Sequence, residues 1–284
     1  MITEIEGIKV GHWTDSSAQT GCTVILFPQE TVASGEIRGG APATRDFALL
    51  DPTRLVDQIN AVVLSGGSAF GLSACSGVME FLEEANIGFN TSAGKVPIVV
   101  GLSLFDLGSG SSTVRPGHQE GKEAASVASS IAPLGRVGAG TGATVSKWRG
   151  KEFSELGGLG GATFREGDLI VSSLIAVNAS GDIDFGEYPN KIRDGQFSIP
   201  KVNPFENTTI GVVATNAKLT KSECFLVSQS AHDGYARALF PAHTSGDGDA
   251  VVVAATGKVP TEMSTIRSLT TLTVETAIKS IANE

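Results

Sequence analysis

The stretch Asn207-Thr208-Thr209-Ile210-Gly211-Val212-Val213-Ala214-Thr215-Asn216-Ala217 decides how the chain is interpreted. It follows residues 202–207, which carry Pro and Asn as loops do. From Thr209 onward, apolar side chains alternate with period two and many are β-branched, so a loop is predicted to become a strand here. Thr208 lies at that junction. It is either an ordinary first residue of a strand or a nucleophile that attacks the peptide bond in front of it.

The composition is that of a globular protein with a large core. Of the 284 residues, 41% are hydrophobic and 18% are charged, and the length allows one or two domains. The 35 glycines are scattered between apolar runs. Their number exceeds the usual share of about 7%, which predicts tight turns and sites lined by backbone rather than disorder.

Charge and targeting signals restrict the possible partners. The net charge of −9 argues against nucleic acid or an anionic membrane surface as a partner. The N-terminus lacks a signal-peptide pattern, and no apolar run is long enough to span a membrane. The isolated residues Cys22, Cys75 and Cys224 form neither a disulfide framework nor a zinc motif. We therefore expect a cytoplasmic protein with no membrane partner.

Hydrophobic periodicity predicts a series of strands and a few helices. A polar loop is expected at 11–15 and a long exposed connection at 181–204. Strands are expected at 8–10, 21–28, 31–36, 59–64, 96–100, 156–164, 169–179 and 250–255, and helices at 72–85, 118–130, 222–239 and 261–282. This order is compatible with an α/β fold but does not specify its layers.

Two glycine-rich segments resemble known loops without matching them. Residues 66–71 lack the spacing of G-x-G-x-x-G and miss G-x-S-x-G by one residue, so we expect a helix start with a serine cap. Residues 135–148 lack the phosphate-loop spacing, and Lys147 is not followed by Ser or Thr. A bulged strand that lays its backbone against an active site is predicted there. Lys147 is either a solvated surface residue or a functional one.

A few polar residues are candidates for chemistry. Asn178 ends a strand expected to be buried on both faces, so it either caps the turn at 180–181 or donates its amide to a ligand. Asp247 and Asp249 would share a face if a strand begins there. They could bind a metal, orient an amine or form an Asp-Gly turn. His12 has no second ligand at a useful spacing, so a loop histidine held by local hydrogen bonds is expected.

Five segments together carry a resemblance to a known family. They are Gly-His-Trp-Thr-Asp at 11–15, Gly-Ala-Gly-Thr-Gly-Ala-Thr at 138–144, Asn207-Thr208, Ala-Thr-Asn-Ala at 214–217, and Pro-Ala-His-Thr-Ser-Gly-Asp-Gly-Asp at 241–249. Nearly end to end, the chain resembles the self-processing N-terminal-nucleophile hydrolases. These include the L-aminopeptidase D-Ala-esterase/amidase, the β-peptidyl aminopeptidases and the endo-type nylon oligomer hydrolase, and the Asn-Thr junction is most similar to the last of these.

The resemblance implies a fold and an assembly. The fold is of the α/β class, a four-layer α/β/β/α sandwich formed by residues 1–284 as a single domain. Cleavage between Asn207 and Thr208 would give chains 1–207 and 208–284, which stay together. The assembly would be a homotetramer or a higher homo-oligomer that acts on a small peptide or amide, with no metal or other cofactor.

The resemblance also implies roles for individual residues. Thr208 matches the nucleophile, Asp247 and Asp249 the pair that holds its amine, and Asn178 an oxyanion donor. Lys147 matches the lysine near the nucleophile. Some members use a tyrosine as a further oxyanion donor, but Tyr188 and Tyr235 do not lie at the matching position.

The chemistry of an N-terminal threonine agrees with these roles. A free α-amine has a pKa of about 7.7–8.0, so it can act as base for the hydroxyl of its own residue. Before cleavage Thr208 has no free amine, so Lys147 or one of the two Asp residues must assist its attack on the Asn207 carbonyl. Two other functions stay open. One is an acyltransferase on a similar scaffold, and the other is an unprocessed, non-catalytic binding protein.

Overall fold

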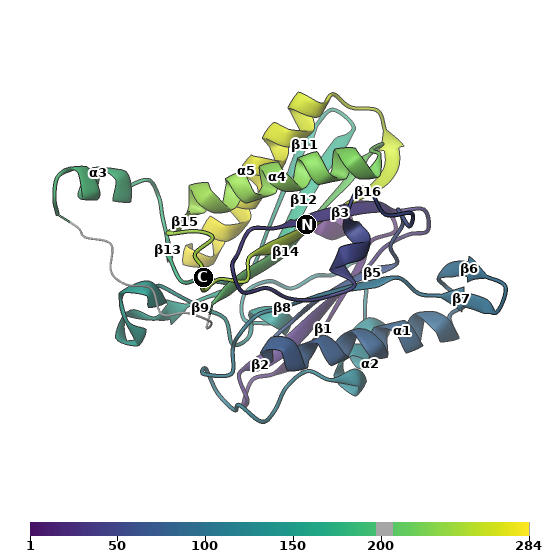
Figure 1. Ribbon diagram of the computed structural model, residues 1–284, viewed down its shortest axis with the longest axis horizontal. Coiled ribbons are helices and arrows are strands. Elements are labelled where there is room, and N and C mark those ends of the chain that lie inside the picture. The colour runs from purple at the N-terminus through teal and green to yellow at the C-terminus, as the bar shows by residue number, and fades with distance from the viewer. Residues whose placement is uncertain (197–206, 284) are drawn as a thin grey trace.

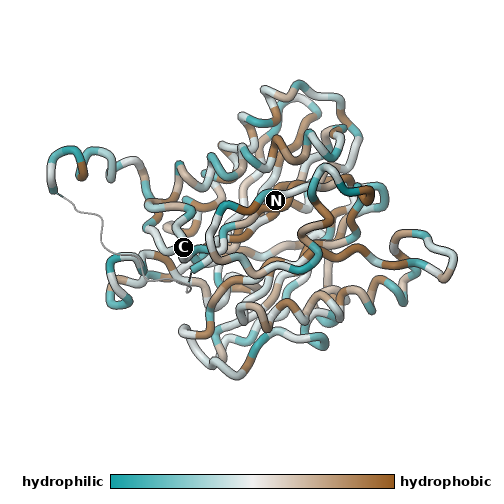
Figure 2. Tube along the Cα trace, viewed as in Figure 1, coloured by the Kyte–Doolittle hydropathy of each residue, from teal (hydrophilic) through white to brown (hydrophobic). Residues whose placement is uncertain are grey.

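Two five-stranded sheets lie face to face, and a pair of helices covers the outer face of each sheet (Figure 1). The computed structural model describes residues 1–196 and 207–283. The α/β class and the four-layer order α/β/β/α that the resemblance implies are thereby confirmed. Figure 2 shows hydrophobic residues concentrated along the central strands and hydrophilic residues at the loops and outer turns.

The first sheet has the strand order β1-β2-β5-β8-β4, in which only β5 and β8 are parallel. Its strands are β1 (Lys9–Asp15), β2 (Thr20–Leu26), β5 (Ala61–Ser65), β8 (Val99–Ser103) and β4 (Ala43–Arg45). Helices α1 (Ala74–Glu84) and α2 (His118–Ser126) pack on it. Glycine permits their close approach, because a Cβ on Gly77 would lie 1.8 Å from the His118 carbonyl oxygen.

The second sheet has the order β11-β12-β14-β16-β3, in which only β14 and β16 are parallel. Its strands are β11 (Gly158–Glu166), β12 (Leu169–Asn178), β14 (Thr208–Ala217), β16 (Ala250–Val259) and β3 (Val32–Ile37). Helices α4 (Lys221–Ala238) and α5 (Met263–Ser280) cover it. Thr220 begins α4 with a capping box, since its hydroxyl accepts from the Glu223 N–H and the Glu223 side chain bonds back.

Strand β14 is buried on both faces, which explains its alternating sequence. Ile210 and Val212 belong to the core between the two sheets. Val213 belongs to the core between the second sheet and helices α4 and α5. Gly211 faces the helices and leaves space for Tyr235 of α4, whose hydroxyl oxygen would lie 3.1 Å from a Cβ at that position. The predicted period of two is confirmed, and the strand begins at Thr208.

The remaining elements are short. Three two-stranded ribbons pair β6 with β7, β9 with β10 and β13 with β15, and α3 has six residues. These elements are β6 (Phe89–Thr91), β7 (Gly94–Val96), β9 (Thr144–Val145), β10 (Glu155–Leu156), β13 (Asp182–Ile183), β15 (Leu239–Phe240) and α3 (Tyr188–Arg193). Seven 3₁₀ turns complete the described chain: Ile2–Glu4, Phe47–Leu50, Ser68–Ser73, Gly138–Gly140, Lys147–Arg149, Lys151–Phe153 and Ile281–Asn283.

The sequence predictions for residues 11–15 and 135–148 are wrong. Residues 11–15 are not a loop but part of β1, because each of them pairs with a residue of β2. Residues 135–148 are not one bulged strand. They form a 3₁₀ turn at 138–140, the two-residue strand β9 and a second 3₁₀ turn. The backbone N–H groups of Gly138 and Ala139 donate to the hydroxyls of Thr14 and Thr23, so they are not available to a strand ladder.

Helix boundaries differ from the predictions by a few residues. The first helix starts as a 3₁₀ turn after Gly67 without a side-chain cap, so the predicted serine cap is wrong. There the Gly67 N–H donates to the Asp106 carboxylate at 2.7 Å instead. The predicted connection at 181–204 contains β13 and α3, and its residues 197–204 lie outside the described residues. Among the described helices, none combines the length and apolarity needed to cross a membrane.

Candidate active site

Strand pairing brings Thr208 and Asn178 side by side. Thr208 is the first residue of β14 and Asn178 the last of the neighbouring antiparallel strand β12, and the two are register partners. Directly opposed residues in an antiparallel pair have Cα atoms about 4.5–5.5 Å apart. Both residues are buried, with exposed fractions of 4% for Thr208 and 0% for Asn178. The predicted nucleophile and the predicted oxyanion donor therefore lie next to each other, where the two strands end.

The Thr208 hydroxyl lies against the peptide bond that precedes it. Its Oγ donates a hydrogen bond to the Asn207 carbonyl oxygen. The same carbonyl oxygen accepts from the Gly248 N–H at 3.0 Å. A Cβ on Gly248 would lie 2.8 Å from Thr208 Oγ and 2.7 Å from the Ala41 carbonyl oxygen, so glycine leaves the space that the hydroxyl occupies.

Asp249 is anchored close to Thr208. Its Oδ1 accepts from the backbone N–H of Thr209 at 2.7 Å. Its Oδ2 accepts from the His243 backbone N–H at 3.1 Å and lies 2.9 Å from His243 Nδ1. Asp249 therefore binds the backbone N–H of the residue that follows Thr208 on β14.

Asp247 is held on the other side of the same loop. Asn207 and Asp247 form an isolated parallel bridge. Asp247 Oδ1 accepts from the Ser180 N–H at 3.1 Å, and Oδ2 accepts from the backbone N–H and the hydroxyl of Thr244. Burial and the nearby charge of Asp249 raise the pKa of Asp247 to about 6. Because β16 begins only at Ala250, both aspartates lie in the loop before the strand.

Asn178 is fixed by partners that define its amide orientation. Its Oδ1 accepts from the Thr144 N–H and from Lys147 Nζ, each at 3.0 Å. Its Nδ2 donates to the Phe105 carbonyl oxygen at 2.9 Å. Two of these partners can only donate and one can only accept, so the network allows one orientation. The second Nδ2–H remains for another acceptor. The side chain is engaged with these groups rather than with the turn at 180–181.

Lys147 is bound to Asn178 and is not a solvated surface lysine. Besides Asn178 Oδ1, its ammonium donates to the Asn178 backbone carbonyl oxygen at 3.3 Å. It lies in the 3₁₀ turn that follows β9. The ammonium of Lys147 is therefore bound to Asn178, the residue that pairs with Thr208 in the sheet.

Sequence reasoning missed three contributors to this site. His243 stacks on Tyr235 with ring centroids 5.7 Å apart and packs edge-on against His232 at 4.8 Å. Burial lowers the pKa of His232 to about 4, so that imidazole is neutral at neutral pH. Thr144 and Phe105 act through backbone groups. His243 and Thr144 lie within segments 241–249 and 138–144, which the resemblance had marked, whereas a backbone carbonyl such as that of Phe105 leaves no side-chain signal.

Other candidates take structural positions. His12 lies in β1, not in a loop, and its Nδ1 is 3.0 Å from the Thr23 hydroxyl of the paired strand. Tyr235 is fully buried and donates to the Ala250 carbonyl oxygen at 3.3 Å. Tyr188 donates to the Asp182 carboxylate. Within residues 1–196 and 207–283, no group of three or more His, Cys, Asp or Glu side chains is arranged to hold a metal ion.

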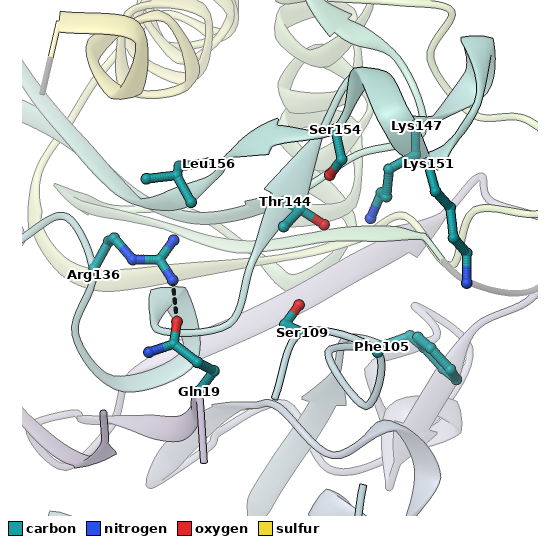
Figure 3. A pocket seen from close by; sticks show the side chains of 10 residues that line it. Gln19, Phe105, Ser109, Arg136, Thr144, Lys147, Lys151, Ser154 and Leu156 are labelled. Atoms are coloured by element: carbon teal, nitrogen blue, oxygen red, sulfur yellow. Dashed lines mark hydrogen bonds between the residues drawn. The ribbon is translucent and has the colours of Figure 1, made fainter. Parts of the chain in front are cut away.

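A pocket of about 250 Å³ opens beside Asn178 (Figure 3). Thr144 and Lys147, which both donate to Asn178, form part of its wall. Gln19 and Arg136 form the other end, where they are hydrogen-bonded to each other. A ligand in this pocket would lie against the groups that orient Asn178.

Comparison with known proteins identifies the family of the chain. The pattern of Peptidase family S58 matches residues 1–284. A Mycobacterium tuberculosis protein named an uncharacterized aminopeptidase is 38% identical over 287 residues, covering 91% of this chain and 82% of that protein. A 6-aminohexanoate-oligomer endohydrolase of Kocuria is 27% identical over 304 residues, covering 99% of this chain and 82% of the relative.

Solved structures show the same fold. The structure of the L-aminopeptidase D-Ala-esterase/amidase from Ochrobactrum anthropi, described as a variant of the Ntn-hydrolase fold, matches with a TM-score of 0.74 at 18% identity. The match covers 99% of this chain and 85% of that one. The resemblance carried by the five sequence segments is confirmed, and the whole chain belongs to peptidase family S58, a family of hydrolases that act on peptide bonds.

Proposed function

We propose that the chain is a self-cleaving amide hydrolase whose nucleophile is the hydroxyl of Thr208. One observation carries the proposal. The β12–β14 register sets Thr208 opposite Asn178, while Asp249 binds the next backbone N–H along the nucleophile's own strand. Hydroxyl, amide donor and carboxylate thus converge on the first residue of a strand. Membership of peptidase family S58 supports hydrolysis of peptide or related amide bonds.

The first step in this proposal is cleavage of the Asn207–Thr208 bond. Thr208 Oγ gives its proton to a base and bonds to the Asn207 carbonyl carbon. The C–N bond breaks, and the Thr208 nitrogen takes a proton and becomes a free amine. Water then hydrolyses the resulting ester, which leaves chains 1–207 and 208–284. We assign the base to Asp247, because its backbone forms a bridge with Asn207 and its carboxylate, with a pKa of about 6, is largely ionised at neutral pH.

The mature enzyme would use the new amine as its base. An α-amine titrates at about 7.7–8.0, so a neutral fraction is present near pH 7.5 to accept the proton from Thr208 Oγ. The hydroxyl attacks the carbonyl carbon of the substrate amide. The leaving amine takes the proton, and water hydrolyses the acyl-enzyme ester. Asp247 and Asp249 favour the charged form of the Thr208 amine and hold it in place.

Asn178 is the proposed oxyanion donor. One N–H of its amide is bound to the Phe105 carbonyl oxygen, and the other is available to the developing oxyanion. Removal of one such donor typically reduces transition-state stabilisation by about 2.7–4 kcal/mol. Thr144 and Lys147 hold the amide oxygen, so the donor is fixed before the substrate arrives.

Denaturing gel electrophoresis of Thr208→Ala and Thr209→Ala tests the proposal. Thr208→Ala should run as one full-length band without amidase activity. Thr209→Ala is the matched control, because Thr209 is a buried threonine on the same strand that the proposal gives no chemical role. It should give two bands of about three-quarters and one-quarter of the chain, and the smaller one should begin at Thr208 on N-terminal sequencing. A cut and active Thr208→Ala protein would overturn the assignment.

A further inference from the structure

The pocket next to Asn178 carries positive charge. Its charged lining residues are Arg136, Lys147 and Lys151, and no Asp or Glu of the described chain lines it. This contrasts with the net charge of −9 for the whole protein. Figure 3 shows Arg136 at one end of the pocket and the two lysines at the other. A substrate ammonium group would find no carboxylate among the described lining residues, whereas an anionic group would find the guanidinium of Arg136.

Among the described residues, Arg136 has no acidic partner. One guanidinium nitrogen, Nη2, donates to Gln19 Oε1. The other, Nη1, is buried and has no hydrogen-bond partner among the described residues. Burial lowers the pKa of this guanidinium below its usual range. A guanidinium that is partly removed from water and has no acidic partner is unfavourable unless a ligand supplies the missing charge.

Other arginines of the chain show the usual arrangement. Many form ion pairs with carboxylates: Arg38 with Glu36, Arg45 with Asp46, Arg149 with Asp182, Arg165 with Glu4 and Arg237 with Glu275. In Arg136 the corresponding contact is an amide oxygen, which orients the guanidinium without neutralising it. This leaves the full positive charge for a ligand that enters the pocket.

We propose that Arg136 binds a carboxylate of the substrate, so that the enzyme selects peptides or oligoamides that carry a free carboxylate at one end. This rests on the function proposed for Thr208 and specifies its substrate class. Arginine suits the task because its planar fork can donate two parallel hydrogen bonds to one carboxylate. Leu156, which is 66% exposed, and Phe105 add apolar surface along the pocket for the chain that precedes the carboxylate.

A binding measurement tests the site without requiring catalysis. Hexanoate and hexanamide have nearly the same shape and differ in charge, and their binding to the purified protein can be measured by ligand-observed NMR titration. The wild type should bind hexanoate about 10- to 100-fold more tightly, the range expected for hydrogen bonds to a charged group. Arg136→Gln should remove this difference. Equal binding of the two probes by the wild type, or no binding of hexanoate, would overturn the proposal.

Gln19→Glu tests the same site with Arg136 still present. The new carboxylate would lie where the Gln19 amide oxygen now meets the guanidinium, and it should occupy Arg136 and remove the preference for hexanoate. Arg165→Gln is the control. It removes an arginine whose partner, Glu4, lies outside the pocket, and it should keep the wild-type preference. If Gln19→Glu still prefers hexanoate as the wild type does, Arg136 is not the binding group.

Kinetics then connect the site to substrate selection. The kcat/KM values for a short peptide amide with a free C-terminal carboxylate and for its C-terminal carboxamide give a selectivity ratio. This ratio should fall about 10- to 100-fold in Arg136→Gln and stay at the wild-type value in Arg165→Gln. An unchanged ratio in Arg136→Gln would refute substrate selection by Arg136. Complete inactivity of a wild type that still prefers hexanoate would instead refute the function proposed for Thr208.

Discussion

Replacement of Asn178 by aspartate separates its proposed role as an oxyanion donor from its role in the fold. The change is nearly isosteric. Oδ1 can still accept from the Thr144 N–H and from Lys147 Nζ, the two 3.0 Å contacts that hold the side chain. The atom that replaces Nδ2 can no longer donate. It would face the Phe105 carbonyl oxygen and the oxyanion, both of which repel it.

The magnitude follows from the lost donor. One oxyanion-hole hydrogen bond contributes about 2.7–4 kcal/mol, which corresponds to a loss of about 10²- to 10³-fold in kcat. The carboxylate of the variant adds repulsion of the oxyanion, and the contact with Lys147 partly compensates for it. We therefore expect kcat for amide hydrolysis to fall at least 100-fold, while KM changes little. Cleavage of the Asn207–Thr208 bond should slow as well, because that step also forms an oxyanion.

The assay must correct for incomplete maturation. The amount of the 208–284 chain on a denaturing gel gives the fraction of cut protein, and kcat is divided by this fraction. Asn216→Asp is the matched control, because Asn216 lies on β14, the neighbouring strand, and its amide bridges the Ile170 N–H and the Asp168 carbonyl oxygen near the end of β14 that is far from Thr208. If the corrected kcat of Asn178→Asp stays within tenfold of the wild type, Asn178 is not the oxyanion donor.

Three further changes probe the groups around Thr208. Lys147→Met removes the ammonium bound to Asn178 and should reduce kcat/KM about 10- to 100-fold in steady-state assays. Lys258→Met is the control, because it removes only an exposed ion pair with Glu6 and should leave kcat/KM unchanged. Equal effects of the two changes would argue against a specific role of Lys147. Gly248→Ala adds a Cβ 2.8 Å from Thr208 Oγ and should block self-cleavage on a denaturing gel, so a normally cut variant would contradict the close approach. The pKa of Asp247 is raised to about 6, above its unfolded value, so its ionisation disfavours the folded state and its contribution to stability falls as pH rises from about 4 to 6. The test compares the unfolding free energy of Thr208→Ala, which stays uncut, with that of the double variant Thr208→Ala/Asp247→Asn. The stability advantage of the protein that keeps Asp247 should increase as the pH falls from 6 to 4. A difference in urea denaturation that does not depend on pH would refute this.

The strand that carries Thr208 could be predicted because both of its faces pack against apolar surfaces along its length. One face of β14 packs on the other sheet and the opposite face on α4 and α5, so every second residue must suit one of two apolar surfaces. This pattern is local and can be read directly. The four-layer order could not be derived in the same way, since it depends on which strands pair across long connections. Only the resemblance of the five segments implied it.

The path of residues 135–148 depends on distant side chains. The N–H groups of Gly138 and Ala139 donate to Thr14 and Thr23, which lie more than a hundred positions earlier in the chain. No local property of a glycine-rich segment indicates such partners.

The site, too, could be predicted only in part. Thr208, Asn178, Lys147, Asp247 and Asp249 were chosen from the sequence and lie within one network around two strand ends, but the charge of the neighbouring pocket was not anticipated. The assembly into a homo-oligomer stays a prediction.

The strand order explains how the proposed cut can leave one folded unit. A cut before Thr208 would place β14 and β16 on the small chain, and β11, β12 and β3 on the large one. In the sheet, β14 and β16 lie between β12 on one side and β3 on the other. The small chain is therefore hydrogen-bonded to the large chain along both of its outer edges. Separation would break two ladders and expose the apolar core between the sheets, so the free amine of Thr208 can form without loss of the surroundings that make it reactive.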